Sequence, residues 1–207
     1  VSGHAWFDGK DLLKESGEFL RKIRGSQIAV VLQNPMTCFD PLYRIGSQMA
    51  ETFAAHTDWD RTKIREISLE VLEKMRIHNP EEVLGQYPHQ LSGGMLQRIM
   101  IGLALAMKPA LLVADEPIAS LDVSIQAQIV NLFRHLQEEH GFTFLFIAHD
   151  LSMVEYLCDR VGVMYHGKLV EVGLTEDVFA QPKHSYTKRL MESIPLPEPG
   201  RKEERRA

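Results

Sequence analysis

The sequence has little of what marks several classes of protein. It has two cysteines, Cys38 and Cys158, whose spacing matches neither a metal-binding pattern nor a disulfide framework, and this fits a reducing compartment such as the cytoplasm. No apolar run approaches the roughly 18 residues that a membrane-spanning helix needs, and no signal peptide is visible. The formal net charge of −5 gives no indication of nucleic-acid binding through an excess of basic charge.

The composition is that of a globular protein with a hydrophobic core. Of the 207 residues, 44% are hydrophobic and 25% are charged, which is ordinary for a soluble domain. The length suits one domain, or one domain with a small insert.

Apolar runs and helical patterns alternate along the chain. Short apolar runs predict buried strands, and apolar residues at helical spacing predict helices. Their alternation predicts an α/β domain with a largely parallel sheet. The predicted elements, in chain order, are a turn at 8–9 followed by a short helix, a buried strand at 28–32, a helical block at 43–84, a buried helix at 93–108, a buried strand at 110–114, an amphipathic helix at 123–140, a buried strand at 142–148, a β-hairpin at 161–173, helical segments at 175–194 and a mobile, proline-rich and charged tail at 195–207.

Polar side chains follow each of the three predicted strands: Gln33 the first, Asp115 and Glu116 the second, and His149 with Asp150 the third. Because ligands bind at the carboxyl ends of parallel strands, we expect these side chains to converge on one binding edge. One carboxylate beside Mg²⁺ and a second that orients water is the arrangement that phosphoryl transfer needs. Each residue alone also has a simpler interpretation, as part of a solvated loop, a helix cap or a structural histidine.

A Ser-Gly-Gly turn, residues 92–94, opens the buried helix. Ser92 is a good helix N-cap, and Gly93 and Gly94 permit a tight turn. The free N–H groups of a helix N-terminus also bind anions, so the turn is a candidate phosphate site.

In order and spacing, these motifs resemble those of the nucleotide-binding subunits of ABC transporters, and the resemblance covers residues 1–194. It implies an α/β, P-loop NTPase-like (ABC ATPase) fold, in which a parallel sheet core carries an inserted helical subdomain. The implied divisions are a partial ATPase core at 1–38, a helical signature subdomain at 39–92, further ATPase core at 93–174, and a C-terminal helix with a mobile tail at 175–207. The motifs are VVLQNP at 30–35 (the Q-loop), LSGGMLQR at 91–98 (the signature motif), LLVADEP at 111–117 (Walker B and the catalytic glutamate), SLD at 120–122 (the D-loop) and AHD at 148–150 (the switch histidine).

The resemblance implies catalytic and metal-binding roles at the strand ends. Gln33 would contact Mg²⁺ or the attacking water and relay contact with the membrane partner. Asp115 would hold Mg²⁺ through water, and Glu116 would be the general base. His149 would stabilise the γ-phosphate.

The resemblance also implies residues that act across a dimer interface. Ser92, Gly93 and Gly94 would bind the γ-phosphate of an ATP held by the opposite subunit. Asp122 would lie at the same interface.

One family motif is absent from the sequence. There is no Gly-x-x-x-x-Gly-Lys-Ser/Thr loop to cradle phosphates, since Asp11 follows Gly9-Lys10 and Leu169 follows Gly167-Lys168. Such a strand–loop–helix unit takes roughly 30 residues or more and should precede Phe7. The sequence begins at Val1, and we expect that it lacks its N-terminal segment, so that this chain alone would bind ATP poorly and hydrolyse little. The alternative is a natural protein that has lost its ATPase activity.

Three further segments resemble importers of oligopeptides, dipeptides and nickel: QNPMTCFDPL at 33–42, LDVSIQAQIVNLF at 121–133 and QPKHSYTKRLMESIP at 181–195. The implied cofactors are ATP and Mg²⁺, and a tail without cysteine predicts no iron–sulfur cluster. The implied partners are a second ATPase subunit, identical or paralogous, and two integral-membrane permease subunits whose coupling helix docks on residues 39–90 beside Gln33. An extracytoplasmic substrate-binding protein would act indirectly, and no nucleic acid would take part.

The implied protein is a peripheral subunit at the cytoplasmic face of the membrane that couples ATP hydrolysis to import of peptides or nickel. Two alternatives stay open. A non-catalytic or regulatory partner would explain the missing phosphate loop. A soluble ABC ATPase of DNA repair or translation would normally carry a long coiled-coil insert or two fused cassettes, and this chain has neither.

Overall fold

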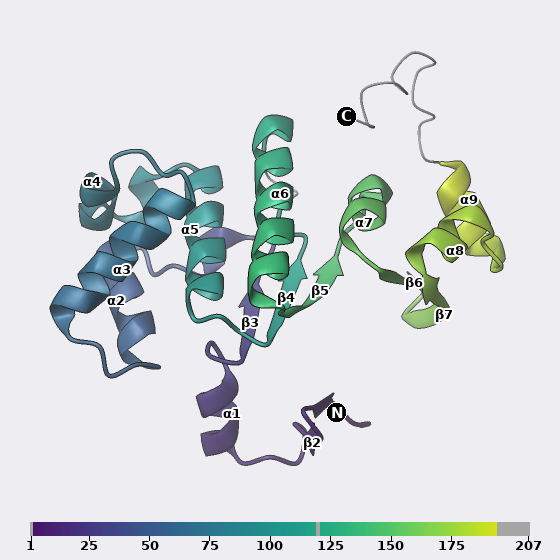
Figure 1. Cartoon of the computed structure of the whole chain (residues 1–207), viewed down its shortest axis with the longest axis horizontal. Helices are drawn as coiled ribbons and strands as arrows, with labels where there is room; N and C mark the ends of the chain where they lie inside the picture. Colours follow the sequence, from purple (N-terminus) through teal and green to yellow (C-terminus); the bar gives the residue numbers. More distant parts are fainter. Residues whose placement is uncertain (1, 119–120, 194–207) are drawn as a thin grey trace. The chain divides into compact units, whose positions relative to one another are not determined.

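A computed structural model of the protein describes residues 2–118 and 121–193 (Figure 1). The chain divides into two compact units, residues 1–147 and 148–207, and each is described by itself. The sequence-based boundaries at 38/39, 92/93 and 174/175 stay predictions. The predicted mobile tail at 195–207 lies outside the described residues.

The first unit begins with a small antiparallel hairpin of β1 (Trp6–Phe7) and β2 (Lys10–Asp11). Its turn is at the predicted place, with φ of +46° at Asp8 and +74° at Gly9. The short helix α1 (Gly17–Ile23) follows, and Ser16 caps it by accepting a hydrogen bond from the Phe19 N–H (3.2 Å).

A three-stranded parallel sheet forms the centre of the first unit. Its order is β3 (Ile28–Val31), β4 (Leu111–Asp115), β5 (Thr143–Ile147), which confirms the predicted parallel sheet. The central strand β4 is the most buried, with Leu112 and Ala114 fully inside.

The prediction that the outer strands are buried is wrong for much of β5. Its side chains alternate between exposed and half-buried, and Leu145 and Ile147 are 52% and 47% exposed. The reason is position: among the described strands, β5 pairs on one side only, with β4. On β3, the other outer strand, Val30 is 50% exposed.

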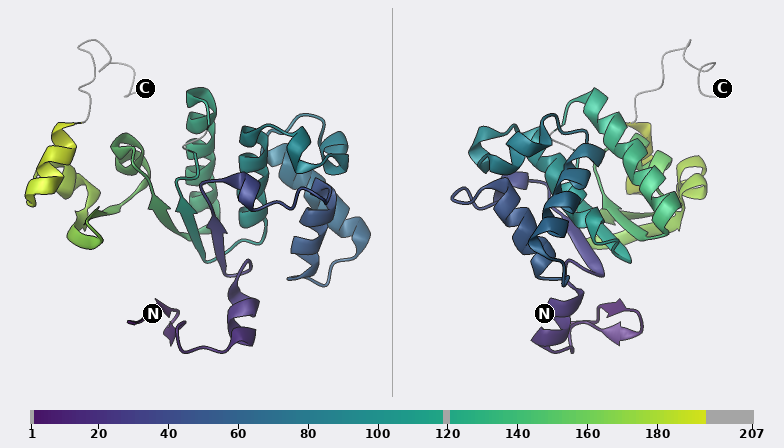
Figure 2. Two further views of the ribbon diagram at one scale, coloured as in Figure 1. Left: turned by 180° about the vertical axis from the view of Figure 1, so that it is seen from behind. Right: turned by 60° about the vertical axis from the view of Figure 1, so that its left-hand side comes forward.

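Two helices cover this sheet, as the views of Figure 2 show for residues 1–147. The predicted buried helix is α5 (Gly93–Ala106), which packs on β3. The predicted amphipathic helix is α6 (Val123–His140), which ends at Gly141 in the left-handed conformation. Its Phe133 ring lies 5.0 Å from that of Phe144 on β5.

The predicted helical block consists of three helices beside α5 (Figure 1), namely α2 (Ile45–Ala54), α3 (Arg61–Lys74) and α4 (Pro80–Gly85), flanked by the 3₁₀ turns η1 (Pro35–Thr37) and η2 (Pro88–Gln90). Helix α3 approaches α5 at Gly102. A Cβ atom there would lie 2.7 Å from both Val71 Cγ1 and Met75 Cγ, closer than carbon atoms can approach, so only glycine fits this contact.

The described residues of the second unit, 148–193, form a hairpin and three helices: α7 (Leu151–Leu157), β6 (Arg160–Tyr165), β7 (Lys168–Leu174), α8 (Thr175–Ala180) and α9 (Ser185–Glu192). The hairpin turns at His166 and Gly167, as predicted, with φ of +46° and +74°.

Glu171 on β7 ties this hairpin to the loop between α8 and α9. The Thr187 hydroxyl and the backbone N–H groups of Lys183 and His184 lower the pKa of Glu171 to about 2. Of these three groups, only the two N–H groups have hydrogen-bond geometry, at 2.8 and 2.9 Å from the carboxylate. We therefore attribute the connection between the hairpin and the loop to these two hydrogen bonds.

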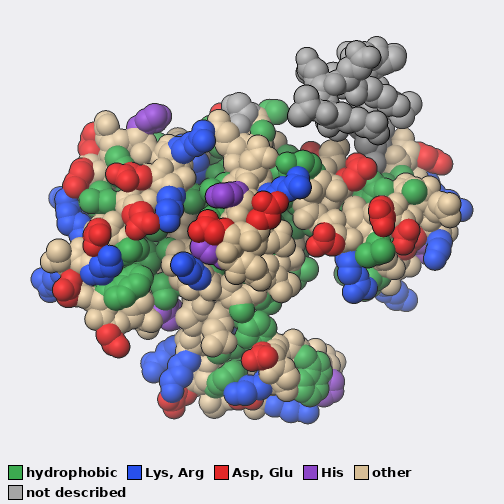
Figure 3. All heavy atoms as spheres, in the orientation of Figure 1, with side chains coloured by type: hydrophobic (Ala, Val, Ile, Leu, Met, Phe, Trp, Pro, Cys, Tyr) green, Lys and Arg blue, Asp and Glu red, His purple; other side chains and the backbone are tan. Residues whose placement is uncertain are grey.

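The surface carries charges of both signs, which are interspersed over the face that Figure 3 shows. Within the described part of the chain, no helix has both the length and the apolar character that a bilayer crossing requires.

Candidate functional site

Two of the predicted strand-end side chains meet in the first unit. Gln33 follows β3 and Glu116 follows β4, and the Gln33 Nε2 donates a hydrogen bond of 2.6 Å to Glu116 Oε2. The two residues are 83 positions apart in sequence, and the parallel pairing of β3 and β4 brings them together. A side-chain amide and a carboxylate thus lie at the carboxyl edge of the sheet, where ligands of such sheets bind.

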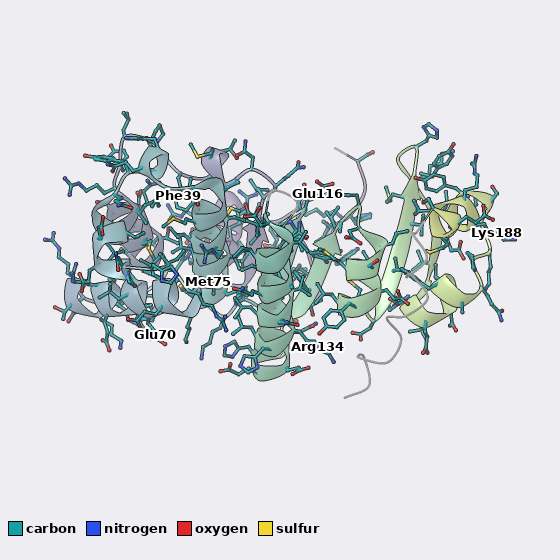
Figure 4. The ribbon with its side chains drawn as sticks, turned by 90° about the horizontal axis from the view of Figure 1, so that it is seen from above. Phe39, Glu70, Met75, Glu116, Arg134 and Lys188 are labelled. Carbon is teal, nitrogen blue, oxygen red and sulfur yellow. The ribbon has the colours of Figure 1, made fainter. Side chains whose placement is uncertain are left out.

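The backbone of Glu116 is strained. Its φ is +45°, a left-handed conformation that costs a non-glycine residue energy and that often marks functional sites. The Glu116 N–H donates to the Ile147 carbonyl of β5 (2.9 Å), which helps to hold this conformation. Figure 4 labels Glu116, whose side chain is half-buried. Such strain makes Glu116 a candidate functional residue.

Asp115, the last residue of β4, is exposed. Within the described residues, no three His, Cys, Asp or Glu side chains gather as a metal site. Mg²⁺ commonly takes one or two protein carboxylates and completes its shell with water and substrate phosphates, so the oxygen donors of Asp115 and Gln33 fit such an ion.

The Ser-Gly-Gly turn forms the start of α5. The Ser92 Oγ accepts a hydrogen bond from the Met95 N–H (3.2 Å), so Ser92 is the N-cap. A Cβ at Gly93 would meet nothing within 4 Å, which leaves its backbone open to a ligand, whereas a Cβ at Gly94 would lie 3.2 Å from Leu121 Cδ2. The geometry therefore combines a helix cap with an accessible helix N-terminus.

Two further predicted residues, Asp122 and His149, lie at the start of α6 and in the second unit. Asp122 is exposed at the start of α6, and its side chain makes no capping hydrogen bond. Ser120 of the same motif lies outside the described residues. His149 belongs to the second unit, next to Asp150, which caps α7 through the Ser152 N–H (2.9 Å). The predicted approach of His149 to the strand ends stays a prediction.

Sequence analysis assigned no role to Gln97, which lies within the LSGGMLQR motif at 91–98. Gln97 of α5 is fully buried, and its Nε2 lies 2.5 Å from the Pro117 carbonyl and 3.4 Å from the Leu32 carbonyl. The available signal was a single amide side chain in the buried part of an otherwise apolar helix.

A groove of about 600 Å³ begins next to Gln33, between β3, the loop after it, α2 and α5. Gln48 of α2 holds the loop in place: its side chain donates to the carbonyls of Asp40 (3.0 Å) and Tyr43 (2.9 Å) and accepts from the Asp40 N–H (2.9 Å). These bonds shape the wall of the groove that the loop forms. The groove is lined by residues that include Val30, Leu32, Cys38, Phe39, Tyr43 and Thr52. Figure 4 labels Phe39.

Comparisons with known proteins match both ends of the chain. A family model described as "ABC transporter" matches residues 1–119, and one described as "Oligopeptide/dipeptide transporter, C-terminal region" matches residues 170–207. Over 195 residues, the chain is 46% identical to the probable peptide ABC transporter ATP-binding protein y4tR of Sinorhizobium fredii and 44% identical to the dipeptide transport ATP-binding protein DppD of Bacillus subtilis. Each alignment covers 94% of this chain but 58% of the relative, so the chain spans little more than half of these proteins.

A solved structure supports the same assignment. The ATP-binding cassette MJ0796, solved as a dimer in a post-hydrolysis state with ADP and Pi, matches with a TM-score of 0.76 and 25% identity, over 84% of this chain and 74% of that one. This confirms the predicted ABC ATPase fold. The chain therefore belongs to the ABC transporter family and carries the C-terminal region of its oligopeptide/dipeptide members.

Proposed function

We propose that this chain is the ATP-binding and hydrolysing subunit of an importer that carries peptides across the membrane. The observation that carries the proposal is the Gln33–Glu116 pair at the carboxyl edge of the sheet, with Glu116 held in a strained conformation. The peptide and dipeptide relatives named above support the substrate class. Nickel, the other cargo of the predicted subfamily, appears in neither of their names.

The proposed reaction is attack of water on the γ-phosphorus of ATP. The P–O bond to ADP breaks, and the water gives a proton to the Glu116 carboxylate. Gln33 would orient the carboxylate or the water through its amide, and Asp115 would hold Mg²⁺. Mg²⁺, when bound, would neutralise charge that develops on the phosphoryl oxygens. His149 would stabilise the γ-phosphate.

We place a second subunit, identical or paralogous, against the exposed start of α5. The open backbone at Gly93, together with Ser92 and Gly94, would receive the γ-phosphate of ATP bound to that subunit. Asp122 would lie at the same interface, where its exposed carboxylate supports a contact across the dimer.

The groove beside Gln33 is our proposed docking site for a short helix of a membrane subunit. It adjoins the catalytic amide through Leu32, and its apolar side chains suit the apolar face of such a helix. Movement of the docked helix would thereby reach Gln33. Thr52→Arg, which fills the groove, should release the membrane subunits during purification, and their retention would contradict this docking site.

The alternative is a non-catalytic or regulatory partner. Mg-ATP binding by calorimetry separates the two, with this chain compared to an extended version that includes any residues encoded upstream of Val1. We expect binding by the extended version and little by this chain. Tight binding by this chain alone would refute our account of the phosphate site, and no binding by either would favour the regulatory partner.

A further inference from the structure

Gln97 makes two hydrogen bonds with a single group. Its side chain is 0% exposed, and its Nε2 donates to the Pro117 carbonyl at 2.5 Å and to the Leu32 carbonyl at 3.4 Å. Both acceptors are backbone carbonyls, so only the amide NH₂ end of Gln97 can face them. Each of the two N–H bonds of this group therefore serves one carbonyl.

The two carbonyls flank the proposed catalytic pair. Leu32 immediately precedes Gln33, Pro117 immediately follows Glu116, and Gln33 itself donates to Glu116. These bonds form a closed ring. It runs from Gln97 to Leu32 and Gln33, then to Glu116 and Pro117, and back to Gln97. A ring of this kind restrains the separation of the two strand ends, because a shift of either end strains at least one of its hydrogen bonds, of which the Gln97–Pro117 bond is buried.

The ring also accounts for the strained backbone of Glu116. A left-handed non-glycine residue persists only where its surroundings hold it. On one side, the Glu116 N–H is bonded to the Ile147 carbonyl, and on the other side, the Pro117 carbonyl is bonded to Gln97.

The same helical turn of α5 is attached to the helical block. Arg98, the next residue, donates from Nη1 to the Met75 carbonyl (3.3 Å) and the Arg76 carbonyl (3.0 Å) at the end of α3. The turn also lies one helical turn beyond Ser92. Neighbouring residues of α5 thus contact the helical block on one side and the strand ends on the other.

One polar atom of Gln97 indicates that packing alone does not explain this residue. Its Oε1 is buried and has no hydrogen-bond partner among the described residues. A buried acceptor without a partner destabilises the fold, so a native one calls for an explanation. Placement of Leu32 and Pro117 by the other end of the amide supplies it.

We propose that Gln97 is a positioning residue, which holds Gln33 and Glu116 in the geometry for hydrolysis and links that geometry to α5. It would contact neither ATP nor water. The effect on hydrolysis rests on the proposed function of Glu116. The effect of Gln97 on the position of the strand ends does not depend on that function.

The test uses two substitutions of similar shape and a matched control. Gln97→Met and Gln97→Glu both lose the NH₂ donors. Gln126→Met is the control, because Gln126 of α6 makes a bond of the same kind, from its Nε2 to the Ile118 carbonyl (3.0 Å), one residue beyond Pro117. The first measurement is amide hydrogen exchange on this chain, read at the Glu116 N–H. We expect faster exchange of that amide in both Gln97 variants than in the control.

The second measurement is ATP hydrolysis by the protein extended to its natural start and assembled with its membrane partners. We expect the Gln97 variants to lose about 10- to 100-fold in kcat with KM for ATP within about twofold, since an interaction that matters only in the transition state lowers kcat alone. Adding Gln33→Ala to Gln97→Met should cost less than the product of the two single effects, because both act on Glu116.

The outcomes separate this proposal from the proposed function. Equal exchange at Glu116 in the Gln97 variants and the Gln126 control overturns the positioning role, whatever the rate of hydrolysis. Equal loss of kcat in all three variants overturns the link to hydrolysis. Faster exchange only in the Gln97 variants, with no hydrolysis by the unaltered assembly, supports the placement and refutes the ATPase assignment.

Discussion

The strained backbone of Glu116 predicts an unusual order of stability for two substitutions. Glu116→Ala and Glu116→Gly both remove the carboxylate and its 2.6 Å hydrogen bond from Gln33, so that loss cancels in a comparison of the two. The alanine variant keeps a Cβ atom at φ +45°, which costs about 1–2 kcal/mol in the left-handed region. The glycine variant avoids that cost but loses about 0.4–1 kcal/mol through the greater freedom of its unfolded chain.

The balance favours glycine by about 0–1.6 kcal/mol in the free energy of unfolding, or about 0.8 kcal/mol at the middle of both ranges. Urea unfolding of this chain measures the difference, with equal slopes as the check that both variants unfold in the same way. At an ordinary helical or extended position, alanine would instead be the more stable. A result in which Glu116→Ala is more stable than Glu116→Gly would therefore refute the strained conformation and the argument built on it.

Three further predictions concern other parts of the chain. Gly102→Val should destabilise the first unit by about 1–3 kcal/mol, because the added atoms overlap Val71 and Met75 of α3, while Gly17→Val, where a Cβ meets nothing, should change thermal unfolding little. Ser92→Ala should cost about 1 kcal/mol of stability in urea unfolding through the lost N-cap, and an unchanged midpoint would argue against that cap. The N–H groups of Lys183 and His184 hold the folded pKa of Glu171 below its ordinary value of 4.5, so its contribution to stability is present above pH 4.5 and is lost as the pH falls through the lowered pKa. Glu171→Gln should flatten that acid dependence, and an identical pH profile would contradict the tie to Lys183 and His184.

Much of the fold follows from local patterns in the sequence. Apolar runs bounded by polar residues predicted all three sheet strands within a few residues, and Gly141 and the His166-Gly167 turn marked a helix end and a hairpin. These signals are local, since they depend on the spacing of side chains and on the conformations that glycine permits. Local sequence patterns do not show that β5 lies at the edge of the sheet. It depends on which strands pair with it, and an edge strand can have the composition of a buried one.

The candidate site divides in the same way. The convergence of Gln33 and Glu116 followed from alternating strands and helices, because parallel neighbours end at one edge. The role of Gln97 could not be predicted, since its partners are backbone carbonyls 65 and 20 residues away in the sequence. Every residue has a backbone carbonyl, so the residue types do not show which carbonyl accepts a hydrogen bond. The left-handed backbone of Glu116 was equally hidden, because glutamate has no preference for that conformation.

The most direct test of the central claim is ATP turnover by Glu116→Gln in the complete protein assembled with its partners. The amide keeps the size of the side chain but cannot accept the proton of water. We predict a loss of turnover on the order of 100-fold or more with ATP still bound, and a dimer that stays closed around it. Unchanged turnover would contradict the assignment of Glu116 as the base, and with it the account of how this edge of the sheet hydrolyses ATP.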